Sequence, residues 1–304
     1  MKPLLALALF SSLNTAWSAE SRFYLGTYTK EQGSKGIYSC SLDTETGRLG
    51  SVQLAAETEN PSYLAMTPDG KFLYAAREMN HQGWVSAFRV ETDSRLTLLN
   101  QQDAGGDGTC HVSVDATGRD VLAANYNSGN LSCFQTKPDG SLGERTALIQ
   151  FAGSGPNRDR QSKPHAHSVY PAPSNRFVYS CDLGTDHVGI FKFDAERGTL
   201  ESNSPAAANA PAGGGPRHLA FHPGGKFVYV NNEMGLSVSV FGCDPASGVL
   251  TPVQVIPTLP ETTPGAGTTT AEIACHPSGK WLYVSTRGDD TLARFAIGVD
   301  GRLT

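Results

Sequence analysis

Apolar positions along this chain recur in a unit of three short strands, and the unit is repeated six times. Each unit has an apolar strand, a small turn, a second apolar strand, a polar loop, a third strand, and an acidic glycine turn that leads to a leucine. The fifth unit, from Arg217 to Leu250, shows this order most completely. Residues such as Pro223 and Gly225 in its hairpin supply the dihedral angles of a tight turn. Short apolar runs bounded by turn residues predict β-strands, and no segment has a helical period.

The third strand of every unit contains one aromatic residue at the same offset. These residues are Tyr38, Phe88, Phe134, Phe191, Phe241 and Phe295. Their spacings are 50, 46, 57, 50 and 54 residues. A period of roughly 40–50 residues with several short strands is typical of a β-propeller. The sequence therefore predicts an all-β fold, a β-propeller with four-stranded antiparallel blades.

The first and last units differ from the others. The first, from Phe23 to Leu49, lacks its first strand, and the sixth ends at Thr304 without a fourth strand. A propeller closes when one end of the chain completes the blade that the other end begins, which removes exposed sheet edges. We therefore expect a seven-bladed ring that is C-terminally incomplete here, with the last blade and the ring closure missing. A ring of six blades would still need two further strands.

The N-terminal segment is typical of a secretory signal peptide. Lys2 precedes a short apolar run, Leu4–Phe10, and small residues at Ala16 and Ser18 fit a cleavage site after Ser18. The run is too short to span a bilayer. We therefore predict a signal peptide over 1–18, a propeller domain over 19–304, and a periplasmic or secreted protein. A disordered leader or a wrongly chosen start codon is the alternative, and the protein would then be cytoplasmic.

The net charge bears on the partners of the protein, and the cysteine spacing bears on its disulfides. The formal net charge is −5, from 24 basic and 29 acidic residues. This balance gives no general attraction to nucleic acid or to an anionic membrane, so we expect neither as a partner. The six cysteines form no Cys-x-x-Cys pair, and most lie within predicted strands. We expect them to be small buried thiols, and not disulfides.

Strand direction predicts one place for the polar residues of the repeat. In an up-and-down blade, the start of the first strand and the end of the second lie on the same face. Innermost strands line the central channel, so residues at these positions should converge on one mouth. They are His111, His165, His167, Arg217, His218 and Glu272 at strand starts, and Arg77, Glu78, Asn125, Tyr126, Asp182, Asn232, Glu233 and Arg287 at strand ends. The alternative role for these side chains is to join the blades by hydrogen bonds.

These residue types suit hydrolysis of an anionic ester. Histidine or glutamate can accept a proton from water, and arginine binds carboxylate or phosphate and stabilises an oxyanion. No Gly-x-Ser-x-Gly elbow is present, which argues against a serine nucleophile. His165 and His167, with His218 and Glu233, could hold a metal ion, but no cysteine pair or acidic cluster supports such a site. We therefore expect no metal and no cofactor.

Several motifs, in one order along the chain, resemble the seven-bladed β-propeller lactonase family, whose best-known member is the cycloisomerase-type 6-phosphogluconolactonase. The motifs are Tyr24–Thr29, Asn125–Asn130, Gly153–Ser168, Gly215–Met234 and Ala271–Gly288. The resemblance extends from about Phe23 to the end of the chain. It implies a lactonase-type propeller that hydrolyses a sugar lactone, 6-phosphogluconolactone, to 6-phosphogluconate in the pentose phosphate pathway. Fungal carboxymuconate cyclases, which share this fold, run lactone chemistry in the other direction.

The resemblance also implies roles for residues in the matching motifs. The predicted catalytic residues are His165, His167, Arg217, His218, Glu233 and Arg287. The predicted substrate-binding residues are Asn125, Tyr126, Arg160 and Glu272. Among these, Glu233 or His167 is the expected base, Arg217 and Arg287 are expected on the anion, and Arg160 could reach a phosphate. Thr286 stands where the family usually has asparagine.

We therefore predict a lactonase that acts as a monomer on a small anionic lactone. An exported enzyme would not meet a cytosolic phosphosugar, so export favours an unphosphorylated aldonolactone as the substrate. Two alternatives remain open at this point. One is a non-catalytic exported propeller that binds a sugar acid or a protein partner, and the other is a carboxymuconate-type lactone cyclase.

Overall fold

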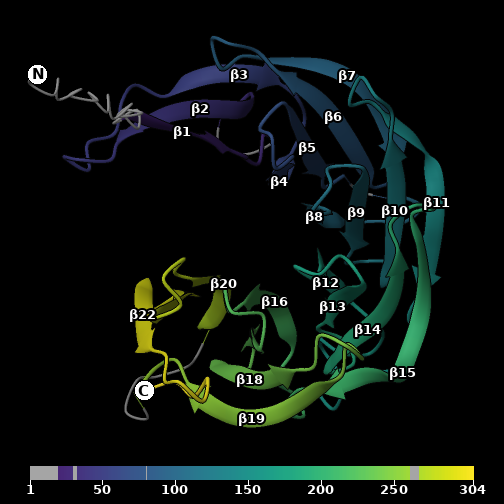
Figure 1. The fold of residues 1–304 in the computed structure, drawn as a ribbon, viewed down its shortest axis with the longest axis vertical. Helices are drawn as coiled ribbons and strands as arrows, with labels where there is room; N and C mark the ends of the chain where they lie inside the picture. The colour runs from purple at the N-terminus through teal and green to yellow at the C-terminus, as the bar shows by residue number, and fades with distance from the viewer. Residues whose placement is uncertain (1–19, 30–32, 80, 261–266) are drawn as a thin grey trace, which may run out of the picture.

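A computed structural model of the chain describes residues 20–29, 33–79, 81–260 and 267–304. These residues form six antiparallel sheets arranged as blades around a central axis, and they contain no helix (Figure 1). The predicted β-propeller with four-stranded antiparallel blades is therefore confirmed. The described residues accordingly offer no apolar helix long enough to cross a membrane. The predicted signal peptide lies outside the described residues.

Four of the six sheets have four strands each, which pair in chain order. The second sheet consists of β4 (Pro61–Met66), β5 (Phe72–Arg77), β6 (Trp84–Val90) and β7 (Leu96–Asp103). The third consists of β8 (Thr109–Val114), β9 (Asp120–Asn125), β10 (Asn130–Thr136) and β11 (Leu142–Gln150). The fourth sheet consists of β12 (Ala166–Pro171), β13 (Phe177–Asp182), β14 (His187–Asp194) and β15 (Thr199–Asn209). The fifth consists of β16 (Pro216–Phe221), β17 (Phe227–Asn232), β18 (Ser237–Cys243) and β19 (Leu250–Pro257).

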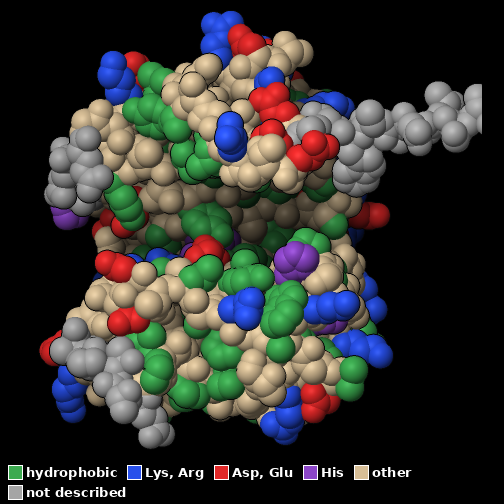
Figure 2. Space-filling model, turned by 90° about the vertical axis from the view of Figure 1, so that its left-hand side faces the viewer, with side chains coloured by type: hydrophobic (Ala, Val, Ile, Leu, Met, Phe, Trp, Pro, Cys, Tyr) green, Lys and Arg blue, Asp and Glu red, His purple; other side chains and the backbone are tan. Residues whose placement is uncertain are grey.

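The first and last sheets have three strands each. They are β1 (Glu20–Leu25), β2 (Gly36–Asp43) and β3 (Gln53–Glu57), and β20 (Thr269–Cys275), β21 (Trp281–Arg287) and β22 (Thr291–Ala296). Tyr38, the repeat aromatic of a third strand, lies in β2, so β1 corresponds to a second strand. As predicted, the described part of the first sheet lacks a first strand and that of the sixth lacks a fourth. The two sheets lie at the ends of an open arc (Figure 1), and the surface is hollowed between them (Figure 2).

The apolar residues form layers between neighbouring blades. One layer joins the fourth and fifth blades and contains Tyr179 and Val228, and four similar layers join the other neighbours. Every residue of β9 and of β13 is buried, as the apolar runs of the second strands predict. The hydroxyl of Tyr179 donates to the carbonyl of Gly248 in the next blade, at 2.9 Å. Apolar contacts therefore hold the blades together, and polar side chains can gather at the axis.

Each first strand contains a register shift close to its start. In β16, Pro216 pairs with Asn232 but His218 pairs with Asn231, so Arg217 is an extra residue. The same shift occurs in β4, β8, β12 and β20. A bulge of this kind bends the strand and turns a side chain out of the regular alternation. The residues at the bulges of β8, β12 and β16 are Cys110, His167 and Arg217, and these three side chains belong to the site described below.

Candidate active site

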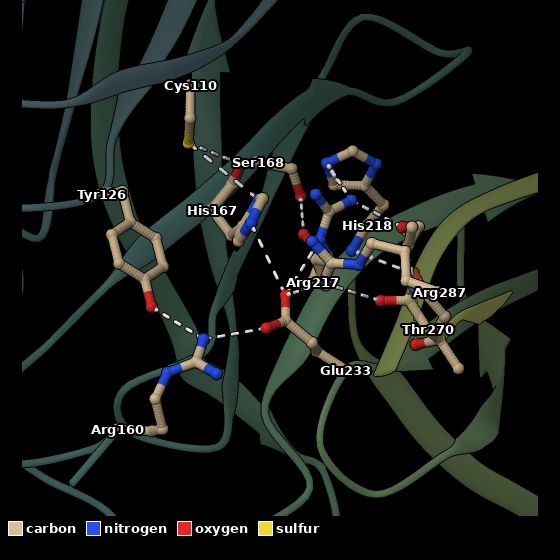
Figure 3. Close-up of polar contacts among 12 residues, drawn as sticks. Cys110, Tyr126, Arg160, His167, Ser168, Arg217, His218, Glu233, Thr270 and Arg287 are labelled. Atoms are coloured by element: carbon tan, nitrogen blue, oxygen red, sulfur yellow. Dashed lines mark hydrogen bonds and ion pairs between the residues drawn. The ribbon is translucent and has the colours of Figure 1, made fainter. Parts of the chain in front are cut away.

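The candidate site is a cluster of charged side chains centred on Glu233, the residue that follows β17. The residue is only 3% exposed, and its carboxylate contacts three guanidinium groups (Figure 3). Arg160 is at 2.8 Å, Arg217 at 3.0 Å and Arg287 at 3.2 Å. A carboxylate offers about four lone-pair positions, so these contacts use most of its acceptor capacity. Three cations around one anion leave the cluster with a positive excess at the mouth.

The arginines differ in how firmly the protein holds them. The Arg217 side chain is 16% exposed, and its guanidinium also donates to the carbonyl of Ala271 at 2.6 Å. Arg160 and Arg287 have exposed fractions of 41% and 52%. Arg217 is therefore a fixed part of the site, while the side chains of Arg160 and Arg287 are partly open to solvent.

His218 connects Arg217 to Glu272. A nitrogen of Arg217 lies 3.4 Å from His218 Nε2, and His218 Nδ1 lies 3.0 Å from a carboxylate oxygen of Glu272. Arginine can only donate, so Nε2 is the acceptor and Nδ1 holds the proton that is donated to Glu272. Burial lowers the pKa of His218, although Glu272 opposes the shift. At Glu272 burial acts to raise the pKa of the carboxyl. The hydrogen bond from His218 acts in the opposite direction, and the pKa of Glu272 is lowered.

His167 lies beside Glu233 as a neutral imidazole. Burial, with the charges of Arg217 and His218, holds the pKa of His167 well below its usual range. Its Nε2 is 3.8 Å from Glu233, too far for a hydrogen bond. Cys110 donates to the carbonyl of His167 at 3.3 Å, and burial raises the pKa of the thiol to about 12. The thiol therefore stays protonated and is no nucleophile.

The long loop between β11 and β12 closes one side of the cluster. Arg160 from this loop donates to the hydroxyl of Tyr126 at 3.2 Å as well as to Glu233. The loop is fixed by the buried amide of Gln161, which donates to Leu183 and Asp186. His165 stacks on Tyr126, with ring centroids 4.4 Å apart, and its Nδ1 faces the Tyr126 carbonyl at 3.0 Å. His165 therefore supports Tyr126 and has no contact with Glu233 in the structure.

The floor of the site is a column of aromatic rings on the axis. His111 lies 4.2 Å from Tyr63, 4.6 Å from Tyr170 and 5.3 Å from His218, measured between ring centroids. Val169 N donates to His111 Nδ1, so Nε2 is the protonated nitrogen. This Nε2 has no hydrogen-bond partner among the described residues. Polar rings thus fill the channel beneath the charged cluster.

The structure brings nine of the ten predicted site residues together, directly or through a neighbour, and places the tenth elsewhere. Asn125 is fully buried. Its amide donates to Ala104 and Asn130, and its oxygen accepts from Thr109. These contacts lie in the third blade and in the connection that leads into it from β7, and they use the whole amide, so we no longer assign Asn125 to substrate binding. Sequence reasoning missed Cys110, although its offset from the strand start is the same as that of His167 and Arg217.

The charges of the cluster favour an anion over a metal ion. Glu233 is paired with guanidinium groups, and His218 is paired with Arg217 and Glu272. Within the described ranges, no three His, Cys, Asp or Glu residues are placed to hold a metal ion. The histidines at the mouth are thus held by hydrogen bonds and ring contacts to their neighbours.

Comparison with known proteins agrees with this fold and site. Residues 22–304 match the family model described as lactonase, 7-bladed beta-propeller. A 6-phosphogluconolactonase of Bacillus subtilis is 38% identical over 275 residues, which cover 90% of this chain and 77% of that protein. A crystal structure of a putative 6-phosphogluconolactonase from Bacteroides fragilis is similar with a TM-score of 0.88 and 34% identity, over 94% of this chain and 81% of that one.

A periplasmic gluconolactonase of Pseudomonas aeruginosa is similar with a TM-score of 0.86 and 28% identity, over 93% of this chain and 81% of that chain. The family match covers far more than half of the sequence. The chain therefore belongs to the seven-bladed β-propeller lactonase family, and the predicted class of activity, lactone hydrolysis, is confirmed.

Proposed function

We propose that this protein hydrolyses a sugar lactone at the mouth formed by Glu233, His167 and the three arginines. The observation that supports this most strongly is the neutral His167 beside a cluster with excess positive charge. Hydrolysis of a lactone needs a base for water and cationic groups for the oxyanion that develops at the carbonyl. The base and the cationic groups lie in one cluster around Glu233. The packed layers between the blades fix the strands that contain His167, Arg217 and Arg287.

In this mechanism His167 is the base, and Glu233 holds the arginines. Nε2 of His167 takes a proton from water as the water oxygen bonds to the lactone carbonyl carbon. The negative charge on the former carbonyl oxygen is stabilised by Arg217 and Arg287. The ring carbon–oxygen bond then breaks, and the ring oxygen leaves with the proton returned by His167. Glu233 is a poorer choice of base because three guanidinium groups already occupy its lone pairs.

The substrate we propose is 6-phosphogluconolactone, or an unphosphorylated aldonolactone if the protein is exported. The first is favoured by the names of the Bacillus subtilis and Bacteroides fragilis relatives. The second is favoured by the Pseudomonas aeruginosa neighbour, which is named as periplasmic. Arg160, with its exposed guanidinium, is the group we assign to a phosphate. The protein would act as a monomer, and seven blades would close its ring, as the family description has it.

The test is a lactone-opening assay on the full-length protein. Acid release is followed in a pH-stat with 6-phosphogluconolactone and with glucono-δ-lactone, and the spontaneous rate is subtracted. We expect catalysed opening of at least one of them, and its loss in Arg217→Ala. Absence of catalysis on both substrates and on a wider lactone panel would refute the proposed function. The ratio of the two rates decides between the phosphorylated and the free sugar lactone.

A further inference from the structure

A second carboxylate, Glu78, occupies the register position of Glu233 in a different blade. Glu78 directly follows β5 (Phe72–Arg77), as Glu233 directly follows β17 (Phe227–Asn232). Both strands have a buried tyrosine at the third position, Tyr74 and Tyr229, so the two registers correspond. Glu78 must therefore lie on the same face of the propeller as Glu233.

The two carboxylates have different partners. Glu233 contacts three guanidinium groups, whereas Glu78 accepts a hydrogen bond of 2.6 Å from the hydroxyl of Tyr28. Within the described residues, Glu78 has no ion pair with a lysine or arginine. Partial burial raises the pKa of Tyr28, and its hydrogen bond to Glu78 raises it further, so the hydroxyl stays a donor. Glu78 therefore keeps acceptor capacity that Glu233 does not have.

The pair is held in place by Asn60, a buried residue with a left-handed backbone (φ 44°). The Asn60 amide donates to the carbonyl of Glu78 at 3.2 Å. The oxygen of the same amide accepts from the backbone N–H of Thr29 at 2.9 Å. One side chain therefore fixes both Glu78 and the residue next to Tyr28. Such fixed placement reduces the ordering cost when a ligand binds.

Tyr28 and Glu78 lie across the axis from the arginine cluster. The second and fifth blades face each other in Figure 1, and side chains from their first strands approach each other at the axis, where the rings of Tyr63 and His218 are 5.5 Å apart. The charges of Glu78 and of Arg217 both act on the thiol of Cys110, with burial as the larger effect on its pKa. The Tyr28 side chain itself is open to solvent, with 57% exposed. The mouth thus has a cationic wall and, opposite, a wall with the carboxylate of Glu78 hydrogen-bonded to the phenol of Tyr28.

We propose that Tyr28 and Glu78 form a subsite for the hydroxyl groups of a polyhydroxylated lactone. This inference rests on the proposed lactonase function. The lactone carbonyl faces the arginines, and the hydroxyl groups at the other side of the ring donate to Glu78 and to the oxygen of Tyr28, whose own proton is donated to Glu78. A site built to pair with substrate hydroxyls discriminates against analogues that lack them, because its own polar groups are then left unpaired. The pair therefore sets specificity and takes no part in proton transfer.

The experiment compares two lactones of equal ring size, glucono-δ-lactone and δ-valerolactone, which has no hydroxyl groups. We measure kcat/KM for the wild type, Glu78→Gln, Tyr28→Phe and the control Tyr38→Phe, which removes a hydroxyl that accepts from Lys35 in the same blade. For glucono-δ-lactone we expect a fall of about tenfold or more in Glu78→Gln and a smaller one in Tyr28→Phe. For δ-valerolactone we expect less than about a twofold change, and no change with either lactone in the control.

Two results would overturn the subsite. An equal loss on both lactones would assign Glu78 to the chemistry or to the fold, and thermal unfolding of the variants would separate these two. Unchanged values on both lactones would mean that the pair does not touch substrate. The proposed function fails only if 6-phosphogluconolactone and the wider lactone panel are not opened either, and calorimetric titration with gluconate decides the subsite in that case: binding weakened in Glu78→Gln supports it, and equal affinity or no binding refutes it.

Discussion

Glu233 and Asp120 are both buried carboxylates next to the inner strands, but they lie at opposite ends of the blades. Glu233 follows the end of β17 at the mouth, while Asp120 begins β9 at the hairpin end. Glu233 is 3% exposed and Asp120 is fully buried. Glu233 has three guanidinium partners, and neither carboxylate oxygen of Asp120 has a hydrogen-bond partner among the described residues. Two carboxylates that are almost equally buried therefore lie in two different chemical environments.

The difference appears in how each carboxylate meets the cost of burial. An ionised carboxylate away from water needs opposite charges or hydrogen bonds, and otherwise it binds a proton. Burial, together with the charge of Asp115, raises the pKa of Asp120 to about 7. At Glu233 the counter-charges are supplied by Arg217 of the same blade, by Arg287 of the sixth blade and by Arg160 of the loop. The arginines at the mouth thus stabilise negative charge there, whereas the carboxylate of Asp120 at the hairpin end has no such counter-charges in contact with it within the described ranges.

The largest effect is expected for Glu233→Gln. Removing the anion leaves three guanidinium groups that repel one another, and the geometry of the oxyanion site is lost. We expect kcat/KM on the preferred lactone to fall by about a hundredfold or more. Steady-state kinetics measures this. A variant within threefold of the wild type would show that Glu233 does not organise the site.

A somewhat smaller loss is expected when single arginines are removed. Arg217→Ala should lower kcat/KM by about 10²-fold, because Arg217 is fixed by contacts to Glu233, Ala271 and His218. Arg287→Ala should cost less, since its side chain is half exposed and water can replace part of its contact. The comparison needs kinetics of both variants on one substrate. The reverse order of effects would contradict the assignment of Arg217 as the fixed cation.

The pH dependence of the wild type gives a third test. The pKa of His167 is held well below its usual range, so the imidazole is neutral and can act as a base through neutral pH. Activity should be present above this lowered pKa and lost as pH falls through it. We therefore expect the acid limb of kcat/KM to lie below about 6.5, the ordinary value for histidine. An acid limb above 7, or the same limb retained in His167→Gln, would contradict a His167 base.

The smallest effect is expected on the stability of the protein, and it comes from Asp120 at the hairpin end of the third blade. The raised pKa of Asp120 means that the folded state holds a proton which the unfolded chain loses near pH 4, so stability falls as pH rises from about 4 to about 7. Asp120→Asn has no such ionisation. Relative to the wild type, its unfolding free energy should improve with rising pH, by about 1 kcal/mol or more at pH 8. Urea unfolding at pH 5 and pH 8 tests this, and a pH-independent difference would refute it.

Repeat pattern and strand direction predicted much of this architecture and the place of the site. The apolar runs Phe72–Ala75 and Phe227–Val230 lie in β5 and β17, where they were expected. The free state of the six cysteines was also predicted correctly. These features follow from period and burial, which a sequence records directly.

Side-chain direction at the strand ends could not be predicted in the same way. Asn125 and Arg287 both end a second strand, but the short amide of Asn125 stays in the blade, where it pairs with Asn130. The long side chain of Arg287 reaches back to Glu233. Likewise, the pairing of Arg217 with His218 depends on the bulge in β16. Side-chain reach and bulges decide these contacts, and the apolar pattern does not contain them.

The most direct test removes one buried carboxylate at each end of the blades and measures lactone opening side by side. Glu233→Gln and Asp120→Asn make the same chemical change, and the pH-stat rate on glucono-δ-lactone and on its 6-phosphate is the readout. We predict that Glu233→Gln lowers the catalysed rate by about a hundredfold or more while Asp120→Asn retains the wild-type rate. Equal rates in the two variants would contradict the assignment of catalysis to the mouth.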